Sequence, residues 1–595
     1  MAEDGTPPGF AYTDPGHAQA VLAGLAALRC DSRLCDVVLG AGGREFPCHK
    51  AVLAASSHYF QAMFAGSMRE SRQARVEIRD VGATALAQLL DYAYTGAVFV
   101  PGDGAVTLLQ AADLLQFPAV KEACCRCLAR QLDISNCLDM QTFAEAFSCP
   151  WLAEAAHRFA ARHAIDVSRR AEFRSLPLHR IIALLSDDHL CVEHEEGAFT
   201  LAARWIRSDP VSRRPFWPDL LEWVRLPFLR RFSLLAAVES EPGVHAAPRC
   251  RELLREARAL QDSPQDRHNV LCPQRLRPRP STGLAEVLVV LGGFDVNCEW
   301  QSGVHCYNQA TGAWRRLALL PQRLVGGYSI AALGNDIYVT GGWDGTQLFP
   351  TVWRYSSAVN EWGRAAAMAQ AYEFHVSVAL GPHLYVIAAN ATQRYDTADD
   401  SWFSLRPLPQ PMQAFSAAAC RGHLYVIGSY EDDVGEDGRV VSTVILSYDP
   451  DVDIWTTLDC DDGKPEWDYV PITVALNGLI YLISHSLAVF ALDPAKRIWH
   501  DVPPMKQIHV GASVTPLGGQ LLVSGGYNSS LELSTEVEAY DAATNVWSTV
   551  AHLPHPSLWH NAVSIFRQFV PPSHGQFRDS HPARTHARRN QAVED

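Results

Sequence analysis

Cysteine and histidine are the side chains here with the most obvious capacity for metal or redox chemistry. Cys124, Cys125 and Cys127 lie together in the stretch ACCRCL. Zinc sites usually need two separated pairs of ligands, and no matching pair follows this cluster. Because the three positions point in different directions on a helix, we interpret them as buried thiols, with a redox-sensing cysteine as the alternative.

Two histidines in the C-terminal half, His485 and His509, are the other candidate pair of ligands. No third ligand is evident beside them, and neither a phosphate-binding loop nor a nucleophile elbow is present in the sequence. We therefore predict no catalytic residue, no bound metal and no cofactor. The chemistry to look for is recognition, in which large side chains on loops are held by a rigid framework.

A tyrosine and a tryptophan that recur at a fixed distance indicate such a framework. In five places a tryptophan follows a tyrosine by seven residues, and in a sixth copy Leu492 replaces the tyrosine ahead of Trp499. The five pairs are Tyr307 and Trp314, Tyr355 and Trp362, Tyr395 and Trp402, Tyr448 and Trp455, and Tyr540 and Trp547. Six copies at intervals of 40 to 53 residues predict a repeat array. We expect the fixed distance to be a tight turn between neighbouring strands, with both aromatics in the core.

A short apolar strand that ends in two mostly small residues precedes each copy. VLVVLGG, IYVTGG and LLVSGG end in glycine pairs, whereas LYVIAA, LYVIGS and IYLISH do not. Two residues with little side chain allow a sharp turn or the close approach of another backbone. Four short strands per copy predict the blade of a β-propeller, and WHNAVSIF, from Trp559 to Phe566, should return to complete the first of six blades.

Large aromatic and apolar side chains stand in the predicted loops at one end of this ring, just ahead of the small-pair strands. A solvated loop has no need of them, and such residues are common at binding hot spots. We predict a shallow peptide-binding face there, although several of these side chains could equally pack down into the blades. The candidates are Tyr328, Tyr372, Phe374, Met412, Phe415, Trp467, Tyr469, His509 and Trp559.

The residues before the predicted propeller show a different pattern of apolar and polar residues. Residues 18–130 combine helical periodicity, as in LLQAADLLQF, with short alternating runs such as ARVEIRDV, and predict an α/β domain. Residues 131–261 contain amphipathic helical patterns and predict an all-α domain. A proline-rich linker is expected at 262–283, the all-β propeller at 284–570, and a disordered tail rich in histidine and arginine at 571–595.

Composition and charge exclude several function classes. The formal charge of −15 argues against a nucleic-acid surface, which needs a concentrated basic stripe. The acidic insertion EDDVGEDG, from Glu431 to Gly438, could favour a basic partner, although most charge runs are simply solvated. The start MAEDGTPPGF does not fit a signal peptide, and no apolar run is long enough to span a membrane. Fifteen scattered cysteines suit a reducing compartment, so we expect a cytoplasmic protein.

The small-pair strand, the tyrosine and the tryptophan resemble the Kelch repeat. CDVVL at Cys35, FPCHKAVLAASSHYFQAMF at Phe46 and LLDYAYTG at Leu89 resemble a BTB domain, and residues 131–261 resemble a BACK domain. The combination resembles the Kelch-like family, whose members are substrate adaptors of Cullin-3 ubiquitin ligases. The resemblance implies a homodimeric adaptor that binds Cullin-3 and a protein substrate and does no chemistry itself. It also implies a role in cell division, at the cytoskeleton or spindle.

Resemblance to BTB adaptors further implies two surfaces on the N-terminal domain. The homodimer interface would be built around residues 18–28. The Cullin-3 surface carries an apolar residue, any residue and a glutamate after the FPCHK-type helix, which are here Met68, Arg69 and Glu70. Met68 would enter an apolar pocket and Glu70 would make polar contacts; the alternative is a surface loop at the end of a helix. Candidate neighbours are Tyr59, Phe64 and Phe117.

Two other function classes stay open at this point. Some BTB-Kelch proteins resemble actin-binding cross-linkers, so a cytoskeletal scaffold without a ligase role is the first alternative. Some Kelch propellers are oxidases with a copper site, but no such set of tyrosines and histidines is evident here. The third and fifth repeats lack the glycine pair, so the loops predicted there are less regular than the others.

Overall fold

The protein is described by a computed structural model that covers residues 12–66, 68–230, 233–269, 274–372, 374–412, 414–432, 440–460, 472–484 and 486–569. The chain forms two compact units, residues 1–177 and residues 178–595. Several sequence predictions fall outside the described residues, namely those for the C-terminal tail, for most of the acidic insertion, and for Trp467, Tyr469 and His485.

The first unit is a small mixed domain followed by further helices. Strand β1 (Val37–Ala41) pairs antiparallel with β2 (Arg44–Cys48) and parallel with β3 (Arg75–Glu77). The helical elements, in chain order, are α1 (His17–Cys30), α2 (Lys50–Ser56), α3 (His58–Ala65), η1 (Arg69–Arg72), α4 (Ala83–Thr95), α5 (Ala105–Leu114), α6 (Pro118–Ala129), α7 (Cys137–Ala146), α8 (Pro150–Arg162), α9 (Ala164–Val167) and α10 (Ala171–Arg174).

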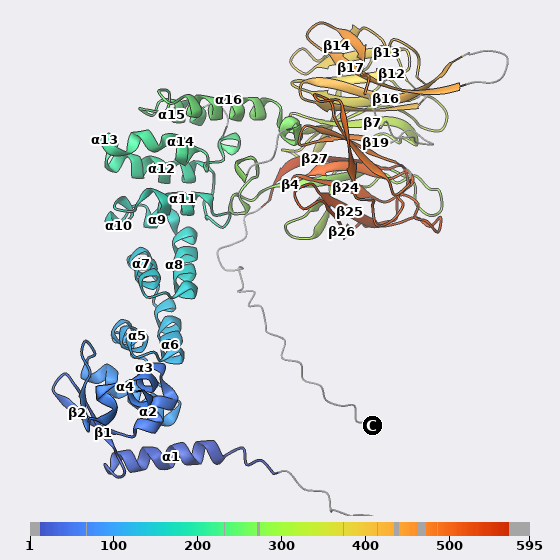
Figure 1. Cartoon of the computed structure of the whole chain (residues 1–595). Coiled ribbons are helices and arrows are strands. Elements are labelled where there is room, and N and C mark those ends of the chain that lie inside the picture. Colours follow the sequence, from blue (N-terminus) through green and yellow to red (C-terminus); the bar gives the residue numbers. More distant parts are fainter. Residues whose placement is uncertain are drawn as a thin grey trace, which may run out of the picture. The chain divides into compact units, whose positions relative to one another are not determined.

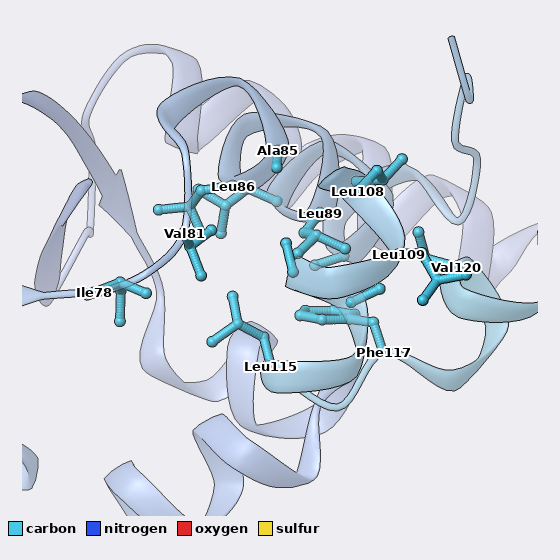
Figure 2. Packing of buried hydrophobic residues seen from close by; sticks show 14 of the residues in the cluster. Ile78, Val81, Ala85, Leu86, Leu89, Leu108, Leu109, Leu115, Phe117 and Val120 are labelled. Atoms are coloured by element: carbon cyan, nitrogen blue, oxygen red, sulfur yellow. The ribbon is translucent and has the colours of Figure 1, made fainter. Parts of the chain in front are cut away.

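A single apolar core joins the sheet of this unit to its helices. Leu86 and Leu89 lie one helical turn apart on α4 and are fully buried. Figure 2 shows them gathered with Leu108 and Leu109 of α5. Helix α4 ends where Gly96 takes a left-handed conformation, with a φ of +69°, and its N–H donates to the carbonyl of Tyr92. The predicted α/β fold of this region is confirmed.

The clustered cysteines of α6 belong to the same core. Cys124 and Cys125 are buried, and Cys127 is half-buried. Burial raises the pKa of both the Cys124 and the Cys125 thiols to about 12, which keeps them protonated and poorly nucleophilic. In the described part of the chain, no group of three His, Cys, Asp or Glu side chains is placed to hold a metal ion.

The second unit begins with further helices, so the regular elements described between residues 131 and 261 are all helical, as predicted. Trp217 is fully buried and stacks on Phe199 with ring centroids 5.8 Å apart. The helices are α11 (Leu178–Ser186), α12 (Glu196–Ser208), α13 (Pro210–Arg213), η2 (Arg214–Phe216), α14 (Trp217–Leu221), η3 (Leu226–Phe228), α15 (Ser233–Glu239) and α16 (Pro248–Asp262). None of the described helices is long and apolar enough to cross a membrane.

In its described residues, the segment predicted as a linker contains three short 3₁₀ helices, η4 (Pro264–Asn269), η5 (Gln274–Leu276) and η6 (Pro280–Thr282). It is not a solvated spacer. Arg279 is fully buried, donates from Nε to Glu195 Oε2 at 2.9 Å, and donates from its other nitrogens to three backbone carbonyls. The guanidinium group of arginine has five N–H donors in a planar arrangement, which suits this site. Its hydrogen bonds tie the segment to the helices that precede it.

The rest of the second unit consists of six four-stranded antiparallel sheets, each one blade of the predicted propeller. Blade 1 contains β27 (Asn561–Gln568), β4 (Leu284–Leu291), β5 (Val304–Asn308) and β6 (Ala313–Arg316). Blades 2 and 3 contain β7 (Gly326–Leu333), β8 (Asp336–Trp343), β9 (Val352–Ser356), β10 (Glu361–Ala365), β11 (His375–Leu380), β12 (His383–Ala388), β13 (Ala391–Asp396) and β14 (Ser401–Leu405).

Blades 4 to 6 repeat the same order. Their strands are β15 (Ala414–Cys420), β16 (His423–Asp432), β17 (Val440–Asp449), β18 (Ile454–Thr457), β19 (Ile472–Leu476), β20 (Leu479–Ile483), β21 (Val489–Asp493), β22 (Ile498–Val502), β23 (Ser513–Leu517), β24 (Gln520–Ser524), β25 (Glu536–Asp541) and β26 (Val546–His552). The first strand of each blade is its inner strand, and each inner strand contacts that of the next blade.

The ring closes where the prediction placed the closure. The last strand, β27, pairs antiparallel with β4 from Asn561 opposite Leu291 to Gln568 opposite Leu284. It also contacts both β23 and β7, so the inner strands form a complete circle. Figure 1 shows β27, in red, beside β4, in green. Pairing the two ends of the array removes the exposed edges that an open stack of sheets would leave.

The register of the outer strands explains the spacing of tyrosine and tryptophan. Tyr355 lies directly opposite Trp362 across the turn between β9 and β10, with ring centroids 5.2 Å apart. The Tyr355 hydroxyl donates to Asn360 Oδ1 at 2.8 Å, and Trp362 Nε1 donates to the carbonyl of Ala318 at 2.9 Å. All six repeats share this cross-strand pairing, including Leu492 opposite Trp499. The predicted turn is confirmed; the repeat tyrosines are buried in the core, whereas the tryptophans other than Trp547 are half-buried against it.

The glycine pairs mark close contacts between blades. A Cβ on Gly292, whose φ is +71°, would lie 2.0 Å from the hydroxyl of Tyr328 in the next blade. A Cβ on Gly341 would lie 2.8 Å from Cε1 of His375, again in the next blade. The strand therefore ends in small residues because a side chain of the following blade occupies the space beside it.

Candidate functional sites

The alternating strand directions give the propeller two different ends. The turns between first and second strands, together with those between third and fourth strands, form one end, which we call the closed end. The loops that lead into the inner strands, and the loops between second and third strands, form the other, which we call the open end. Within the described residues, the loops that lead into the inner strands comprise 317–325, 366–372, 374, 406–412, 458–460, 503–512 and 553–560. Those between second and third strands comprise 292–303, 344–351, 389–390, 484, 486–488 and 525–535.

The closed end is covered by the chain's own 3₁₀ turn η4. Gln265 accepts from the N–H of Gly334 at 3.3 Å and donates to the carbonyl of Gly381 at 2.6 Å. The carbonyl of His268 accepts from the N–H of Asn477 at 2.6 Å. These contacts join η4 to blades 2, 3 and 5, so this mouth of the ring is occupied.

A buried group of charges fixes η4 in that position. Arg267 Nη2 lies 2.6 Å from Glu286 Oε1, and His268 Nε2 lies 3.3 Å from the same oxygen. Glu286 Oε2 also accepts from the N–H of Gly518 at 3.0 Å. Burial alone would raise the pKa of Glu286, but the charges of Arg267 and His268 hold it well below its usual range.

Two of the predicted binding residues have mostly solvent-exposed side chains at the open end. Phe374 is 71% exposed and Trp559 is 65% exposed. Tyr328 and Phe415 are half-buried, and Trp467 and Tyr469 lie outside the described residues. A large aromatic side chain left this open to water is the kind of group that gains most from contact with a partner.

Three of the predicted residues do not present their side chains at the surface, contrary to the prediction. Tyr372, Met412 and His509 are buried. The Tyr372 hydroxyl accepts from Gln393 Nε2 at 2.7 Å, and His509 Nδ1 lies 2.7 Å from the carbonyl of Gly525. They pack down between blades because each finds a hydrogen-bond partner or an apolar pocket there.

Local backbone geometry holds Trp559 in its exposed position. Its φ is +51°, an uncommon value for a large side chain, and its N–H donates to the carbonyl of Gly511 at 2.9 Å. The indole meets the ring of Phe294 edge to face at 6.2 Å between centroids. A Cβ on Gly511 would lie 2.9 Å from Trp559 Nε1, so only glycine leaves room for the indole.

Sequence reasoning missed a second group of exposed apolar side chains at the open end. They stand on the loops between second and third strands or, for Trp343, at the end of the second strand β8, whereas the prediction considered only the loops ahead of the inner strands. They are Val296, Trp343, Leu348, Leu487 and Leu531. A usable signal was present for Trp343, because it directly follows a glycine pair and therefore comes at the end of the strand.

The first unit presents the other candidate site. Met68 follows α3 and is 53% exposed, and Glu70 is half-buried in η1. The carbonyl of Met68 accepts from the Ser71 hydroxyl at 2.7 Å, and Lys50 Nζ donates to the carbonyl of Ser71 at 2.9 Å. These bonds hold the turn in shape while leaving the methionine side chain in water.

The three predicted neighbours of this turn differ in exposure. Tyr59 and Phe64 are half-buried, and both contact the ring of Phe60, at 5.4 and 5.8 Å between centroids. Phe117 is only 1% exposed and lies in the core, as Figure 2 shows. Its ring packs against Phe60 and Tyr92, so it supports the site from beneath and has no surface for a partner.

Helix α1, which contains the predicted dimer segment, has no buried residue of its own. Arg29 anchors its C-terminal end through Asp91, at 3.2 Å, and lies over the ring of Tyr94. Val21 is exposed, and Leu25 and Ala26 are half-buried against the domain. The helix therefore leaves apolar surface uncovered within the described chain.

Comparison with known families identifies each part of the chain. Residues 25–132 match the BTB/POZ domain, and residues 137–239 match BACK, "BTB And C-terminal Kelch". Residues 325–369 and 509–554, which correspond to blades 2 and 6, match the Kelch motif.

Similarity to whole proteins extends over almost the entire length. The chain is 54% identical to "Kelch-like protein 21" of Mus musculus and to that of Homo sapiens, over 94% of this chain and 93% of each relative. It is 34% identical to "Kelch-like protein 30" of Homo sapiens over 93% of this chain and 95% of the relative. The chain belongs to the Kelch-like family of proteins with BTB, BACK and Kelch domains.

Proposed function

We propose that this protein is the substrate-recognition adaptor of a Cullin-3 RING ubiquitin ligase. One observation carries the proposal: of the two ends of the propeller, one is filled by the protein's own chain, and the other presents exposed aromatic side chains. Phe374 and Trp559, together with the exposed Trp343 at the end of β8, would bind a peptide segment of the substrate. The adaptor contributes proximity and no chemistry of its own.

The N-terminal domain would dock onto the cullin. Met68 would fill an apolar pocket of Cullin-3, Glu70 would make polar contacts, and the half-buried rings of Tyr59 and Phe64 would flank them. The exposed methionine on a hydrogen-bonded turn supports this assignment, because its apolar side chain has no partner within the described chain.

Dimerisation through α1 would double the number of receptors in the complex. Its uncovered apolar residues, around residues 18–28, would pair with the same helix of a second copy. Two propellers on one dimer could hold two sites of one substrate at high effective concentration if the geometry allows both to engage. We place the protein in the cytoplasm and, by its resemblance to family members active in cell division, at the cytoskeleton or spindle.

Pulldown of the full-length protein with Cullin-3 tests the docking half of the proposal. Glu70→Lys should abolish capture, because it places a cation where a carboxylate is needed. Arg69→Ala is the matched control, because it lies in the same turn at a position with no required side chain, and it should bind normally. Capture of Cullin-3 by Glu70→Lys at the level of the unchanged protein would contradict the proposal, and co-sedimentation with actin filaments would then favour the scaffold.

Cross-linking of the full-length protein in cell extract, followed by mass spectrometry, tests the receptor half. Cross-linked partners should be lost when Trp559→Ala and Phe374→Ala are combined. The matched control combines Val359→Ala with Val452→Ala, which removes exposed apolar side chains from the closed end. Equal loss in both variants would show that the open end is not the receptor.

A further inference from the structure

Lysine is almost absent from this protein. Of its 50 lysine and arginine residues only five are lysines, and residues 122–463 contain none. The five are Lys50, Lys121, Lys464, Lys496 and Lys506. Lysine Nζ is the group to which a ubiquitin ligase attaches ubiquitin, so for an adaptor held inside such a ligase the distribution of lysine decides which parts of its own surface can be modified.

The two N-terminal lysines are poorly available for that reaction. Lys121 Nζ lies 2.6 Å from Asp113 Oδ1 and 2.6 Å from the carbonyl of Phe147, and its side chain is 20% exposed. Lys50 Nζ donates to the carbonyl of Ser71 at 2.9 Å and lies 5.7 Å from the centroid of the Phe64 ring. An amine must lose a proton and leave such contacts before it can act as a nucleophile.

The described lysines of the propeller are presented quite differently. The side chain of Lys496 is 71% exposed, and its nitrogen lies 3.5 Å from Asp493, a weak contact for a group so open to water. It stands in the turn between β21 and β22. Lys506 is exposed on a loop of the open end, where its backbone N–H donates to the buried Glu538 at 3.0 Å and fixes the loop.

The structure explains most of the arginines by their contacts, but not a small set on the propeller surface. Arg267 and Arg279 use several nitrogens of the guanidinium at once, which a lysine could not reproduce. A second set is exposed and forms no ion pair with any described carboxylate, so lysine would serve equally well for solubility. This set comprises Arg316, Arg323, Arg406 and Arg497, whereas the guanidinium groups of Arg315 and Arg364 lie over the rings of Phe569 and Trp353.

We infer that the protein directs self-ubiquitination to Lys496 and Lys506 of the propeller, and that exposed arginine in place of lysine protects the rest of the described adaptor. This inference rests on the proposed function. In the reaction, Nζ attacks the thioester carbonyl of ubiquitin's C-terminus on the conjugating enzyme. The new carbon–nitrogen bond forms as the carbon–sulfur bond breaks, the enzyme's thiol leaves, and the amine's proton passes to solvent.

A reconstituted reaction tests the inference. The full-length protein, Cullin-3 with its RING subunit, the activating and conjugating enzymes, ubiquitin and ATP are combined, and modified adaptor peptides are mapped by mass spectrometry. Modification should map to Lys496 and Lys506. The variant Lys496→Arg with Lys506→Arg should lose most of the modification of the adaptor. Persistent modification of that variant at the unchanged rate, on Lys50, Lys121 or the N-terminus, would overturn the inference.

A gain-of-lysine variant tests the protective role of arginine. Arg316→Lys combined with Arg323→Lys adds two exposed amines at positions without ion pairs to described carboxylates, and should create new ubiquitin sites there and raise total adaptor modification. Unchanged modification would show that the arginines give no protection.

Two readouts that do not depend on ligase activity separate the possible failures. Acylation of the full-length protein by a small amine-reactive ester should label Lys496 and Lys506 much faster than Lys50 and Lys121, and equal rates would contradict the inference by themselves. Cullin-3 capture by all lysine and arginine variants should equal that of the unchanged protein. Loss of capture by the unchanged protein would contradict the proposed function instead.

Discussion

The two ends of the propeller are built from the same repeat, yet they differ in what covers them. At the closed end, η4 lies across the mouth, and Arg267, His268 and Glu286 are buried together there. At the open end, Phe374 and Trp559 stand in water although the loops that carry them are well held. Buried charges at one end serve stability, whereas exposed aromatics at the other cost stability nothing and remain available for a partner.

The largest effect is expected at the closed end. The substitution Glu286→Leu leaves Arg267 buried without its counter-ion. It should lower the free energy of unfolding by about 3–5 kcal/mol. Chemical denaturation, followed by tryptophan fluorescence of the propeller, measures this change. The control is Arg354→Ala, which breaks a solvent-exposed ion pair with Asp336 and should cost less than about 1 kcal/mol. Equal costs would mean that the buried group does not hold η4.

The contact between blades 1 and 2 should have the next largest effect. Gly292→Ala forces a methyl group against the Tyr328 hydroxyl and should cost about 1–3 kcal/mol in the same denaturation experiment. Adding Tyr328→Phe removes the hydroxyl and should recover part of the loss. Gly312→Ala is the control, because its φ is also positive but no atom lies within 4 Å of the new Cβ. If both glycine variants lose equal stability, the backbone angle rather than the contact between blades is responsible.

A titration should separate two carboxyl groups of the closed end that respond to pH in opposite directions. Burial raises the pKa of Asp266 from 3.8 to about 6, so folding is most favoured with this group below pH 3.8, and that stability is lost as the pH rises through 6. Asp266→Asn should therefore stabilise the protein at pH 7 by about 1–2 kcal/mol and have little effect at pH 4.

Glu286 has the opposite sign, because its pKa in the folded state is lowered. Its stabilisation is fully present above its ordinary pKa of 4.5 and is lost as the pH falls further. Thermal unfolding of the unchanged protein and of Asp266→Asn at pH 4 and pH 7 measures both trends. Equal stabilisation by Asp266→Asn at the two pH values would contradict this account of the charge balance at the closed end.

The smallest effect on stability is expected at the open end. Trp559→Ala combined with Phe374→Ala removes two rings that are mostly exposed, and should change the free energy of unfolding by less than about 0.5 kcal/mol each. The same variant should lose its cross-linked partners. A large loss of stability would mean that these two aromatic side chains help to hold the propeller together. The two ends of the propeller would then not differ in the way described above.

The blades could be predicted from the amino-acid pattern alone. Cross-strand pairing of Tyr355 with Trp362 and its counterparts depends on residues seven positions apart, so periodicity reveals it. Ring closure by β27 was also predictable, since it follows from counting strands. The same reasoning located Phe374 and Trp559, the two predicted aromatics that the structure exposes at the open end.

Which loop side chains face water, and what fills the closed end, depends on contacts that form only in the folded chain. Three other large side chains on equivalent loops point inward instead, namely Tyr372, Met412 and His509. Tyr372 and His509 do so because Gln393 and the carbonyl of Gly525 form hydrogen bonds with them there. Arg279 meets Glu195 across 84 positions, and His268 meets Ser564 across 296. Local pattern carries no information about such partners, because burying a charged or polar group is favourable only when folding brings its distant counterpart within hydrogen-bonding distance.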